Sequence, residues 1–295
     1  MNILLTGATG FIGSAVAKAL KNSSEHSVTA LSSRNIDGIQ TVLHNGYNFD
    51  KKFLASQGCE GLNALVHLGA FIPKSSATAD DLGMSFSNIA NTKTLLESEL
   101  PNLRRIVYIS TIDVYTSNDV ITEATVPNPV SLYGQSKLYC ERMAQCHAKQ
   151  KGISCAVLRL GHVFGPGEEA YKKVIPNAIR SILAGEPVRI YNGGKDRRSF
   201  IYIDDVVKAI VNAVDYTGDA PVINVTGNEP RSISEIIDFL EIASGKKAPR
   251  EYIETGVPSR DVIFDSALLK QELLSEFTPV PEGLKKEYDY MAGRK

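Results

Sequence analysis

The chain has 295 residues, with 32 Lys and Arg against 33 Asp and Glu, and therefore a formal net charge of −1. This balance excludes a broadly basic surface for nucleic acid or anionic lipid. Its 43% hydrophobic and 22% charged residues exclude disorder as the main state and predict a globular protein with a substantial core. No apolar run approaches membrane-spanning length. The four cysteines are far apart, which predicts neither a zinc site nor a disulfide scaffold, so we expect a cytoplasmic, metal-free protein.

Short apolar runs alternate with helical patterns in the first half of the chain. The runs predict strands at residues 3–5, 28–31, 64–68, 105–109 and 155–160, and helical spacing of apolar residues predicts helices at 11–20, 88–100 and 132–149. Continuously apolar strands that are separated by helices indicate a parallel sheet covered on both faces. We therefore predict an α/β fold with a doubly wound parallel sheet.

After about residue 165, glycine and proline punctuate shorter elements, which predicts a second, smaller mixed α/β lobe. The helical pattern at 232–242 is its longest regular piece. A strand at 222–225 and the helix before it, at 205–215, suit an extension of the first sheet. We therefore expect two domains that interleave: residues 1–165 with 204–226, and residues 166–203 with 227–295.

A glycine-rich turn, Thr6-Gly7-Ala8-Thr9-Gly10-Phe11-Ile12-Gly13, lies between the first predicted strand and the first predicted helix. Small residues there let the backbone approach a pyrophosphate, and the helix N-terminus directs free N–H groups at that anion. A lone glycine triplet also occurs in turns that bind nothing, but the strand before it and the helix after it favour a dinucleotide site. We expect the cofactor to contact Gly7, Thr9, Gly10, Phe11, Ile12 and Gly13.

The end of the second strand distinguishes the two nicotinamide dinucleotides. An acidic residue there binds the ribose hydroxyl of NAD, whereas a basic residue accommodates the phosphate of NADP. Ser33 and Arg34 follow the strand, and no carboxylate occurs before Asp37. This favours NADP(H) over NAD(H), with an arginine in a surface loop as the alternative interpretation.

Tyrosine four residues before lysine occurs three times, at Tyr47, Tyr133 and Tyr191. On a helix this spacing stacks both side chains on one face, where the cation lowers the pKa of the phenol and suits it to proton transfer. Only Tyr133 with Lys137 begins a clear helical pattern. Thr111 follows a strand whose carboxyl end would lie at the ligand-binding edge of the sheet.

Together these residues resemble the extended short-chain dehydrogenase/reductases, the NAD(P)-dependent family of nucleotide-sugar epimerases, dehydratases and reductases. The resemblance covers nearly the whole chain. Several linked motifs occur in order, which is more specific than any one of them. They are the glycine turn, His67-Leu68-Gly69-Ala70, Asn88 with Thr92, Ser110-Thr111 followed by Tyr115, Tyr133-x-x-x-Lys137, Leu158-Arg159, Gly165-Pro166-Gly167, and the run from Arg198 to Val206.

The resemblance implies a catalytic triad of Thr111, Tyr133 and Lys137. Tyr133 would protonate the sugar ketone, Lys137 would bind the nicotinamide ribose and lower the tyrosine pKa, and Thr111 would hydrogen-bond the carbonyl oxygen. The remaining site residues are implied in the same way: Leu68, Gly69 and His162 along the cofactor, and Arg198 and Arg260 at the substrate diphosphate. A surface arginine at Arg198 and a structural histidine at His162 remain open alternatives.

Departures from the family pattern narrow the function. Dehydratases of the family carry an Asp-Glu pair after the strand-end threonine, where this chain has Ile112-Asp113. Isoleucine cannot donate a proton, which disfavours dehydration. Ser33 and Arg34 favour a released NADP(H), so the leading prediction is reduction of the C4 ketone of a nucleoside-diphosphate 4-keto-6-deoxy or dideoxy sugar. The alternatives are an NAD-dependent nucleotide-sugar 4-epimerase, a reductase of other ketones and a non-catalytic NAD(P)-sensing regulator.

Relatives often dimerise through two helices that correspond to residues 88–100 and 132–149. We therefore expect a homodimer with a nucleoside-diphosphate sugar as substrate and with no nucleic-acid or membrane partner. Five apolar residues of these helices could line the dimer interface or could instead face the sheet: Ala90, Leu95, Leu96, Leu138 and Met143.

Overall fold

The computed structural model describes residues 1–116, 120–256 and 260–294, and its contacts divide the chain into two units. The first comprises Met1–Thr116, Val126–Leu160 and Val207–Ile223. The second comprises Ser117–Thr125, Gly161–Val206 and Asn224–Lys295, in which 117–119, 257–259 and 295 lie outside the described residues. The boundaries differ from the predicted ones because Ile121 bridges to Phe264 and residues 162–164 pair with 200–202, all within the second unit.

A seven-stranded sheet forms the centre of the first unit, in the order β11-β6-β5-β4-β1-β2-β3. Its strands are β1 (Asn2–Thr6), β2 (Ser27–Ser32), β3 (Gln40–Leu43), β4 (Ala64–His67), β5 (Arg105–Thr111), β6 (Ser154–Leu160) and β11 (Val222–Val225). The paired strands from β3 to β6 run parallel. This confirms the predicted fold class. Only β3 was not predicted, because this short edge strand buries a single residue, Val42.

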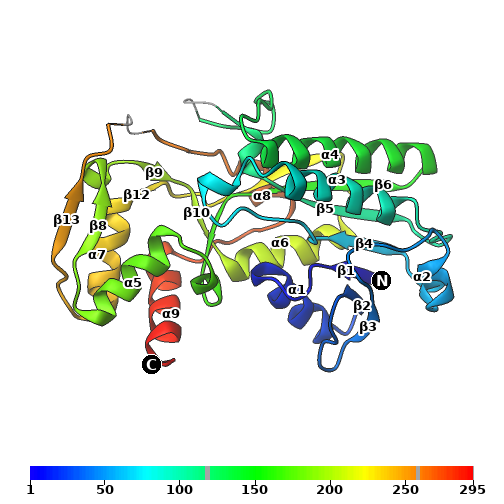
Figure 1. Ribbon diagram of the computed structural model, residues 1–295, viewed down its shortest axis with the longest axis horizontal. Helices are drawn as coiled ribbons and strands as arrows, with labels where there is room; N and C mark the ends of the chain where they lie inside the picture. Colours follow the sequence, from blue (N-terminus) through cyan, green and yellow to red (C-terminus); the bar gives the residue numbers. More distant parts are fainter. Residues whose placement is uncertain (117–119, 257–259, 295) are drawn as a thin grey trace. The chain divides into compact units, whose positions relative to one another are not determined.

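Helices cover both faces of this sheet (Figure 1): α3 (Leu82–Leu96) and α4 (Leu132–Lys151) on one, α1 (Phe11–Lys21) and α6 (Ile203–Asp215) on the other. A short helix, α2 (Phe53–Ser56), follows β3. Asp81 caps α3 by accepting from the Met84 amide, so α3 begins six residues before its predicted start at 88. Ser131 caps α4 in the same way.

The core between the sheet and helices α3 and α4 contains Leu4, Leu65 and Ile106 from the strands. Leu95 and Leu96, which were candidates for a dimer interface, belong to this core and are 1% and 7% exposed. Met143 packs against the same cluster. Of the two interpretations of these residues, the structure therefore favours the one in which they face the sheet.

In its described residues, the second unit contains three two-stranded pairings: β7 (His162–Phe164) with β10 (Phe200–Tyr202), β9 (Arg197–Arg198) with β12 (Arg231–Ser232), and β8 (Val188–Tyr191) with β13 (Arg250–Ile253). Its remaining helices are α5 (Val174–Ala184), α7 (Ile233–Ser244), α8 (Ala267–Glu272) and α9 (Val280–Ala292). The expectation that 232–242 is the longest regular piece was wrong, because α9 has 13 residues against 12 in α7.

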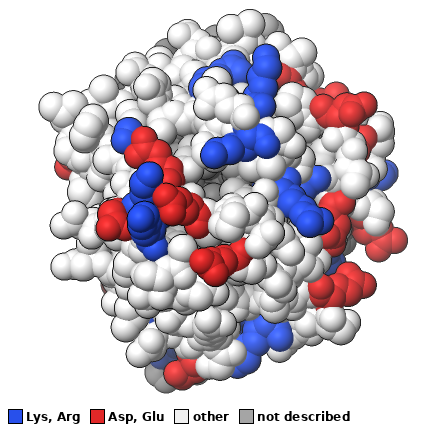
Figure 2. All heavy atoms as spheres, turned by 90° about the vertical axis from the view of Figure 1, so that its right-hand side faces the viewer, with Lys and Arg blue, Asp and Glu red and all other residues white. Residues whose placement is uncertain are grey.

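Charged side chains of both signs are interspersed on the face shown in Figure 2. Among the described residues, no helix is both long enough and apolar enough to cross a membrane.

Helix α9 carries a buried acid, Glu287, whose side chain is fully inaccessible. Burial, and next the nearby carboxylate of Glu168, raise the pKa of Glu287 from 4.5 to about 9. The folded protein therefore retains a proton on Glu287 between these pH values that the unfolded chain releases, so the contribution of Glu287 to stability falls as pH rises, by at most about 1.4 kcal/mol per pH unit. We expect Glu287→Gln to flatten this slope in urea unfolding between pH 6 and pH 8.5.

The control for this prediction is Glu282→Gln, since Glu282 lies on the same helix with an exposed side chain paired to Lys286. This variant should retain the wild-type slope. An unchanged slope in Glu287→Gln would contradict the prediction.

Candidate active site

The glycine turn brings two stretches of backbone into direct contact. Gly7 has φ +73°, and a Cβ on it would lie 2.7 Å from the Gly69 nitrogen. A Cβ on Gly13 would lie 2.0 Å from the Gly7 carbonyl oxygen. The turn after β1, the start of α1 and the loop after β4 can therefore pack together only with glycine at these positions.

The N-terminus of α1 has the features that a pyrophosphate requires. Gly10 is its N-cap, no side chain caps the helix, and its first turn contains no acidic residue. The amides of this turn are therefore not committed to a side-chain cap, and no carboxylate repels an anion. Thr9 and Gly10 are exposed, and Phe11 and Ile12 are half-buried. These residues fit a dinucleotide held at the helix N-terminus.

Ser33 and Arg34 lie at the same edge of the sheet as this turn. Thr6 pairs in register with Leu31, so the residues after β1 and after β2 leave the sheet side by side. Both Ser33 and Arg34 are exposed, and the Arg34 amide donates to Ser32 Oγ at 3.3 Å. The strand end thus presents a hydroxyl and a guanidinium at the surface, and their contact with a cofactor phosphate stays a prediction.

A buried hydrogen-bond network that the sequence did not predict supports the turn. Thr6 Oγ1 accepts from the Gly69 amide at 2.9 Å and is hydrogen-bonded to His67 Nδ1 at 2.7 Å, while His67 Nε2 lies 3.0 Å from Thr92 Oγ1. Burial, with a smaller contribution from Lys137, lowers the pKa of His67 to about 3. The imidazole is therefore neutral and acts as a structural link between β1, β4 and α3.

Gly69, where the family often has alanine, has a physical explanation. A Cβ at this position would lie 2.6 Å from the Tyr47 hydroxyl, which also hydrogen-bonds Thr6. Tyr47 reaches this position with φ 59°, which is unusual for a bulky residue. The glycine thus provides the space that the Tyr47 phenol occupies.

The structure places Thr111, Tyr133 and Lys137 in the first unit, at the carboxyl end of β5 and in the first two turns of α4. All three are at most 8% exposed. Thr111 Oγ1 accepts from the Asp113 amide at 3.2 Å, and the Tyr133 amide donates to the Ala79 carbonyl at 2.9 Å. The Tyr133 ring meets Phe71 edge-on at 6.3 Å. Tyr133 and Lys137 lie one turn apart on one face, as predicted.

The other two tyrosine–lysine pairs lack this geometry. Residues 47–51 lie in the irregular segment between β3 and α2, and residues 191–195 span the end of β8 and the short helix Asn192–Gly194. The prediction that only Tyr133 begins a helix is therefore confirmed.

Lys137 is 3% exposed, and its Nζ donates to the Ile109 carbonyl at 2.6 Å. The ammonium also lies 4.5 Å from the centre of the Tyr108 ring. Burial lowers the pKa of Lys137 to about 8, against the opposing effects of Cys140 and Glu141. Below that pH the ammonium form predominates, one turn from the Tyr133 phenol.

Asn88 connects the loop after β4 to the start of α4. Its Oδ1 accepts from the Phe71 amide at 2.7 Å, and its Nδ2 donates to the Phe71 carbonyl at 3.3 Å and to Ser136 Oγ at 3.2 Å. Ser136 Oγ in turn donates to the Tyr133 carbonyl at 2.8 Å. One buried side chain thus links the loop after Gly69 to the helix turn that carries Tyr133.

The second unit brings Arg198 and Arg260 together. Arg198 Nη1 donates to the backbone carbonyls of Arg197 and Arg260, and its Nη2 pairs with Asp196 at 3.0 Å. The sequence did not predict these internal partners. Arg260 directly follows residues 257–259, which lie outside the described part of the chain. The diphosphate-binding roles of both arginines stay predictions.

His162 lies on β7 of the second unit, with its ring 5.8 Å from that of Phe200. Burial, followed by the charges of Arg198 and Lys173, lowers the pKa of His162 to about 3. The side chain is therefore neutral at physiological pH, and its contact with a cofactor stays a prediction.

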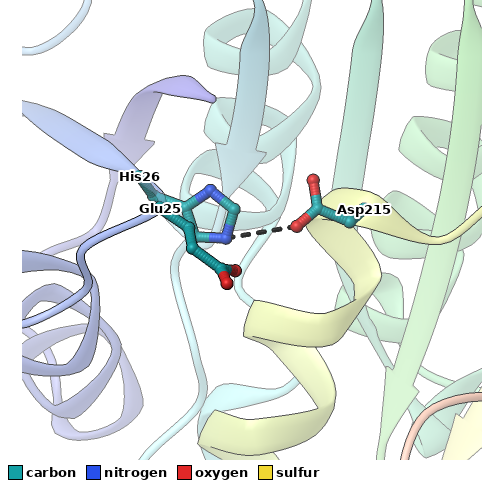
Figure 3. Close-up of side chains that lie close together, drawn as sticks. All are labelled: Glu25, His26 and Asp215. Atoms are coloured by element: carbon teal, nitrogen blue, oxygen red, sulfur yellow. Dashed lines mark ion pairs between the residues drawn. The ribbon is translucent and has the colours of Figure 1, made fainter.

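One group of three potential metal ligands occurs among the described residues: Glu25, His26 and Asp215 (Figure 3). His26 Nε2 pairs with Asp215 at 3.3 Å. Glu25 and His26 precede β2, so the group lies at the amino ends of the strands, away from the glycine turn and from the start of α4. The Arg105 guanidinium also acts on Asp215, so this carboxylate already faces a cation of the protein.

The fold and these residues define a dinucleotide-dependent enzyme, and comparison with known proteins identifies its family. The pattern of the NAD dependent epimerase/dehydratase family matches residues 3–226. The chain belongs to this family. The resemblance to the extended short-chain dehydrogenase/reductases is confirmed, and with it the prediction of an NAD(P)-dependent enzyme of nucleotide sugars.

Several similar proteins extend over the whole chain. The uncharacterized UDP-glucose epimerase YtcB of Bacillus subtilis (strain 168) is 27% identical over 314 residues, which cover 99% of this chain and 98% of the relative. The structure of UDP-glucuronic acid 4-epimerase from Bacillus cereus with UDP-glucuronic acid and NAD is 28% identical, with a TM-score of 0.86 and 100% of both chains covered. UDP-glucose 4-epimerase from Thermotoga maritima with UDP-glucose is 25% identical, with a TM-score of 0.83, and 100% of this chain and 99% of that chain are covered.

Proposed function

We propose that this protein is an NAD(P)-dependent 4-epimerase of a UDP-sugar. The observation that carries the proposal is the triad Thr111, Tyr133 and Lys137 at the carboxyl end of the sheet, in a chain that 4-epimerase structures match from end to end. Those structures contain UDP-glucuronic acid and UDP-glucose, which are the first substrates to test.

The dinucleotide, when bound at the glycine turn, supplies reversible hydride transfer at the sugar C4 carbon. Tyr133 accepts the proton of the C4 hydroxyl during oxidation and returns a proton to the C4 oxygen when the ketone is reduced on its opposite face. Thr111 donates a hydrogen bond to the same oxygen. Lys137, charged below about pH 8, favours the phenolate of Tyr133. One hydride and one proton leave and return, so no net oxidation occurs.

Ile112 supports epimerisation over dehydration. It follows Thr111 directly, is 8% exposed and cannot exchange a proton with a substrate. Elimination of water would require an acid at this position. We further propose a cytoplasmic homodimer, a compartment in accord with the four free cysteines.

One observation favours a second candidate, an NADP(H)-dependent reductase of a 4-keto-6-deoxy or dideoxy nucleotide sugar. Ser33 and Arg34 at the end of β2 suit the additional phosphate of NADP, and no carboxylate occurs before Asp37. An NADP(H) that exchanges with solution suits net reduction.

The two candidates are separated by one set of assays. The purified protein is denatured to identify any retained dinucleotide, and the native protein is incubated with UDP-glucose, UDP-glucuronic acid and their C4 epimers. We expect interconversion of C4 epimers without net consumption of NADH or NADPH. Oxidation of NADPH by 4-keto-6-deoxy nucleotide sugars, without interconversion, would support the reductase and overturn the epimerase.

A further inference from the structure

Two consecutive residues at the end of β5 contact two successive turns of α4. The Ile109 carbonyl accepts from Lys137 Nζ at 2.6 Å, and Ser110 Oγ donates to Glu141 Oε1 at 2.5 Å. Tyr133, Lys137 and Glu141 are spaced by four residues and therefore lie in one row along the helix. Glu141 thus extends the tyrosine–lysine pair by one turn toward the C-terminal end of α4.

Glu141 is held by a bidentate ion pair with Arg159 of β6. Its Oε1 accepts from Arg159 Nε at 2.9 Å and its Oε2 from Nη2 at 2.7 Å. Arg159 Nη1 donates to the Tyr115 hydroxyl at 2.5 Å. Glu141 is 1% exposed and Arg159 is 3% exposed. Two opposite charges are therefore buried together with nearly all of their hydrogen-bonding groups engaged.

Several titratable side chains of the described residues face Lys137, and the carboxylate of Glu141 is the charged one. From β4, His67 is neutral; from β5, Tyr108 contributes a buried phenol; and α4 contributes the Cys140 thiol and the Glu141 carboxylate beside Tyr133. Burial opposes the ammonium form of Lys137, whereas Cys140 and, next, Glu141 favour it. Arg159 is paired with this carboxylate through two hydrogen bonds, so removal of Arg159 would leave the Glu141 charge uncompensated beside Lys137.

We propose that Glu141 and Arg159 are positioning residues, which fix the end of β5 against α4 and hold Lys137 as an ammonium ion in line with Tyr133. The effect of this pair on kcat rests on the proposed function, whereas its effect on the charge state of Lys137 does not. If the pair were only structural, breaking it would destabilise the fold, but the two single variants would not shift the pKa of Lys137 in opposite directions. A positioning pair predicts opposite effects from its two members, because each single variant leaves the other charge uncompensated.

The test is a pH titration of Lys137 in the intact chain, monitored by NMR of ¹³Cε-labelled lysine. We expect Glu141→Gln to lower the titration midpoint of Lys137 by about one pH unit and Arg159→Met to raise it by a similar amount. The double variant should return close to the wild-type midpoint. The exposed pair Lys93–Glu97 on α3 is the matched control, and its removal should leave the midpoint unchanged.

Two further variants keep the proposal testable if the single variants do not fold. Arg159→Lys retains the positive charge, so the titration midpoint of Lys137 should stay at its wild-type value. Because the bidentate hydrogen bonds to Glu141 are lost, kcat should fall while KM stays unchanged. Ser110→Ala removes one hydrogen bond to Glu141 without a change in charge and should act in the same way.

Shifts of equal sign in Glu141→Gln and Arg159→Met, or no shift in any folded variant, would overturn the proposal. Opposite shifts in a protein without epimerase activity would support the charge coupling and contradict only the proposed function. A shift in Arg159→Lys as large as that in Arg159→Met would also contradict the proposal.

Discussion

Replacement of Tyr133 by phenylalanine is expected to slow epimerisation at the sugar C4 carbon by about 10²–10⁴-fold, since the proton acceptor and donor is lost. Dinucleotide binding should persist, because the glycine turn and Lys137 are unchanged. The fold should also persist, because the phenylalanine ring retains the edge-on contact with Phe71 at 6.3 Å. Steady-state kinetics together with calorimetric titration of NAD would separate the two effects.

The matched control is Tyr139→Phe on the same helix, where the tyrosine side chain is 58% exposed. This variant should turn over substrate as fast as the wild type. Activity of Tyr133→Phe within a few-fold of the wild type would remove Tyr133 from the proton transfer, and a parallel loss of NAD binding would point to a structural effect.

Replacement of Gly13 by alanine is expected to weaken dinucleotide binding at least tenfold, or about 1.4 kcal/mol. The added Cβ would lie 2.0 Å from the Gly7 carbonyl oxygen and 2.8 Å from the Gly7 carbonyl carbon. Both neighbours are backbone atoms, so the turn must move away from α1, and the amides that we expect to face the pyrophosphate move with it. Overpacking of this kind also costs roughly 1–3 kcal/mol of stability.

Gly61→Ala is the control, since a Cβ there meets no atom within 4 Å. Its urea midpoint and its Kd for NAD should stay near those of the wild type. If Gly13→Ala bound NAD as tightly as the wild type, the contact between the glycine turn and α1 would not be what shapes the expected dinucleotide site.

Helices α5 and α9 show why the second unit was hard to predict. Each has a proline in its first turn, and α9 also contains Gly283, so neither reads as a regular helix in the sequence. A Cβ on Gly283 would lie 2.8 Å from both Phe164 and Tyr202. Glycine is therefore needed at this position because side chains that are distant in the sequence pack directly against it.

The sequence by itself determined the class of fold, the glycine turn between β1 and α1, and the pairing of Tyr133 with Lys137. These features depend on local physics: apolar periodicity, the conformational freedom of glycine and the pitch of a helix. A spacing of four residues places two side chains on one face in any helix, whatever the rest of the chain does.

Only the tertiary structure determined how that pair is supported. Asn88, Glu141 and Arg159 contact residues between 17 and 48 positions away, and Tyr47 occupies the space that Gly69 leaves. The same holds for Arg198, for which the sequence left a diphosphate site and a surface position open, and which donates to the Arg260 carbonyl 62 positions away. Such contacts depend on which strands and loops become neighbours, and this adjacency follows from the packing of the whole sheet rather than from any local pattern.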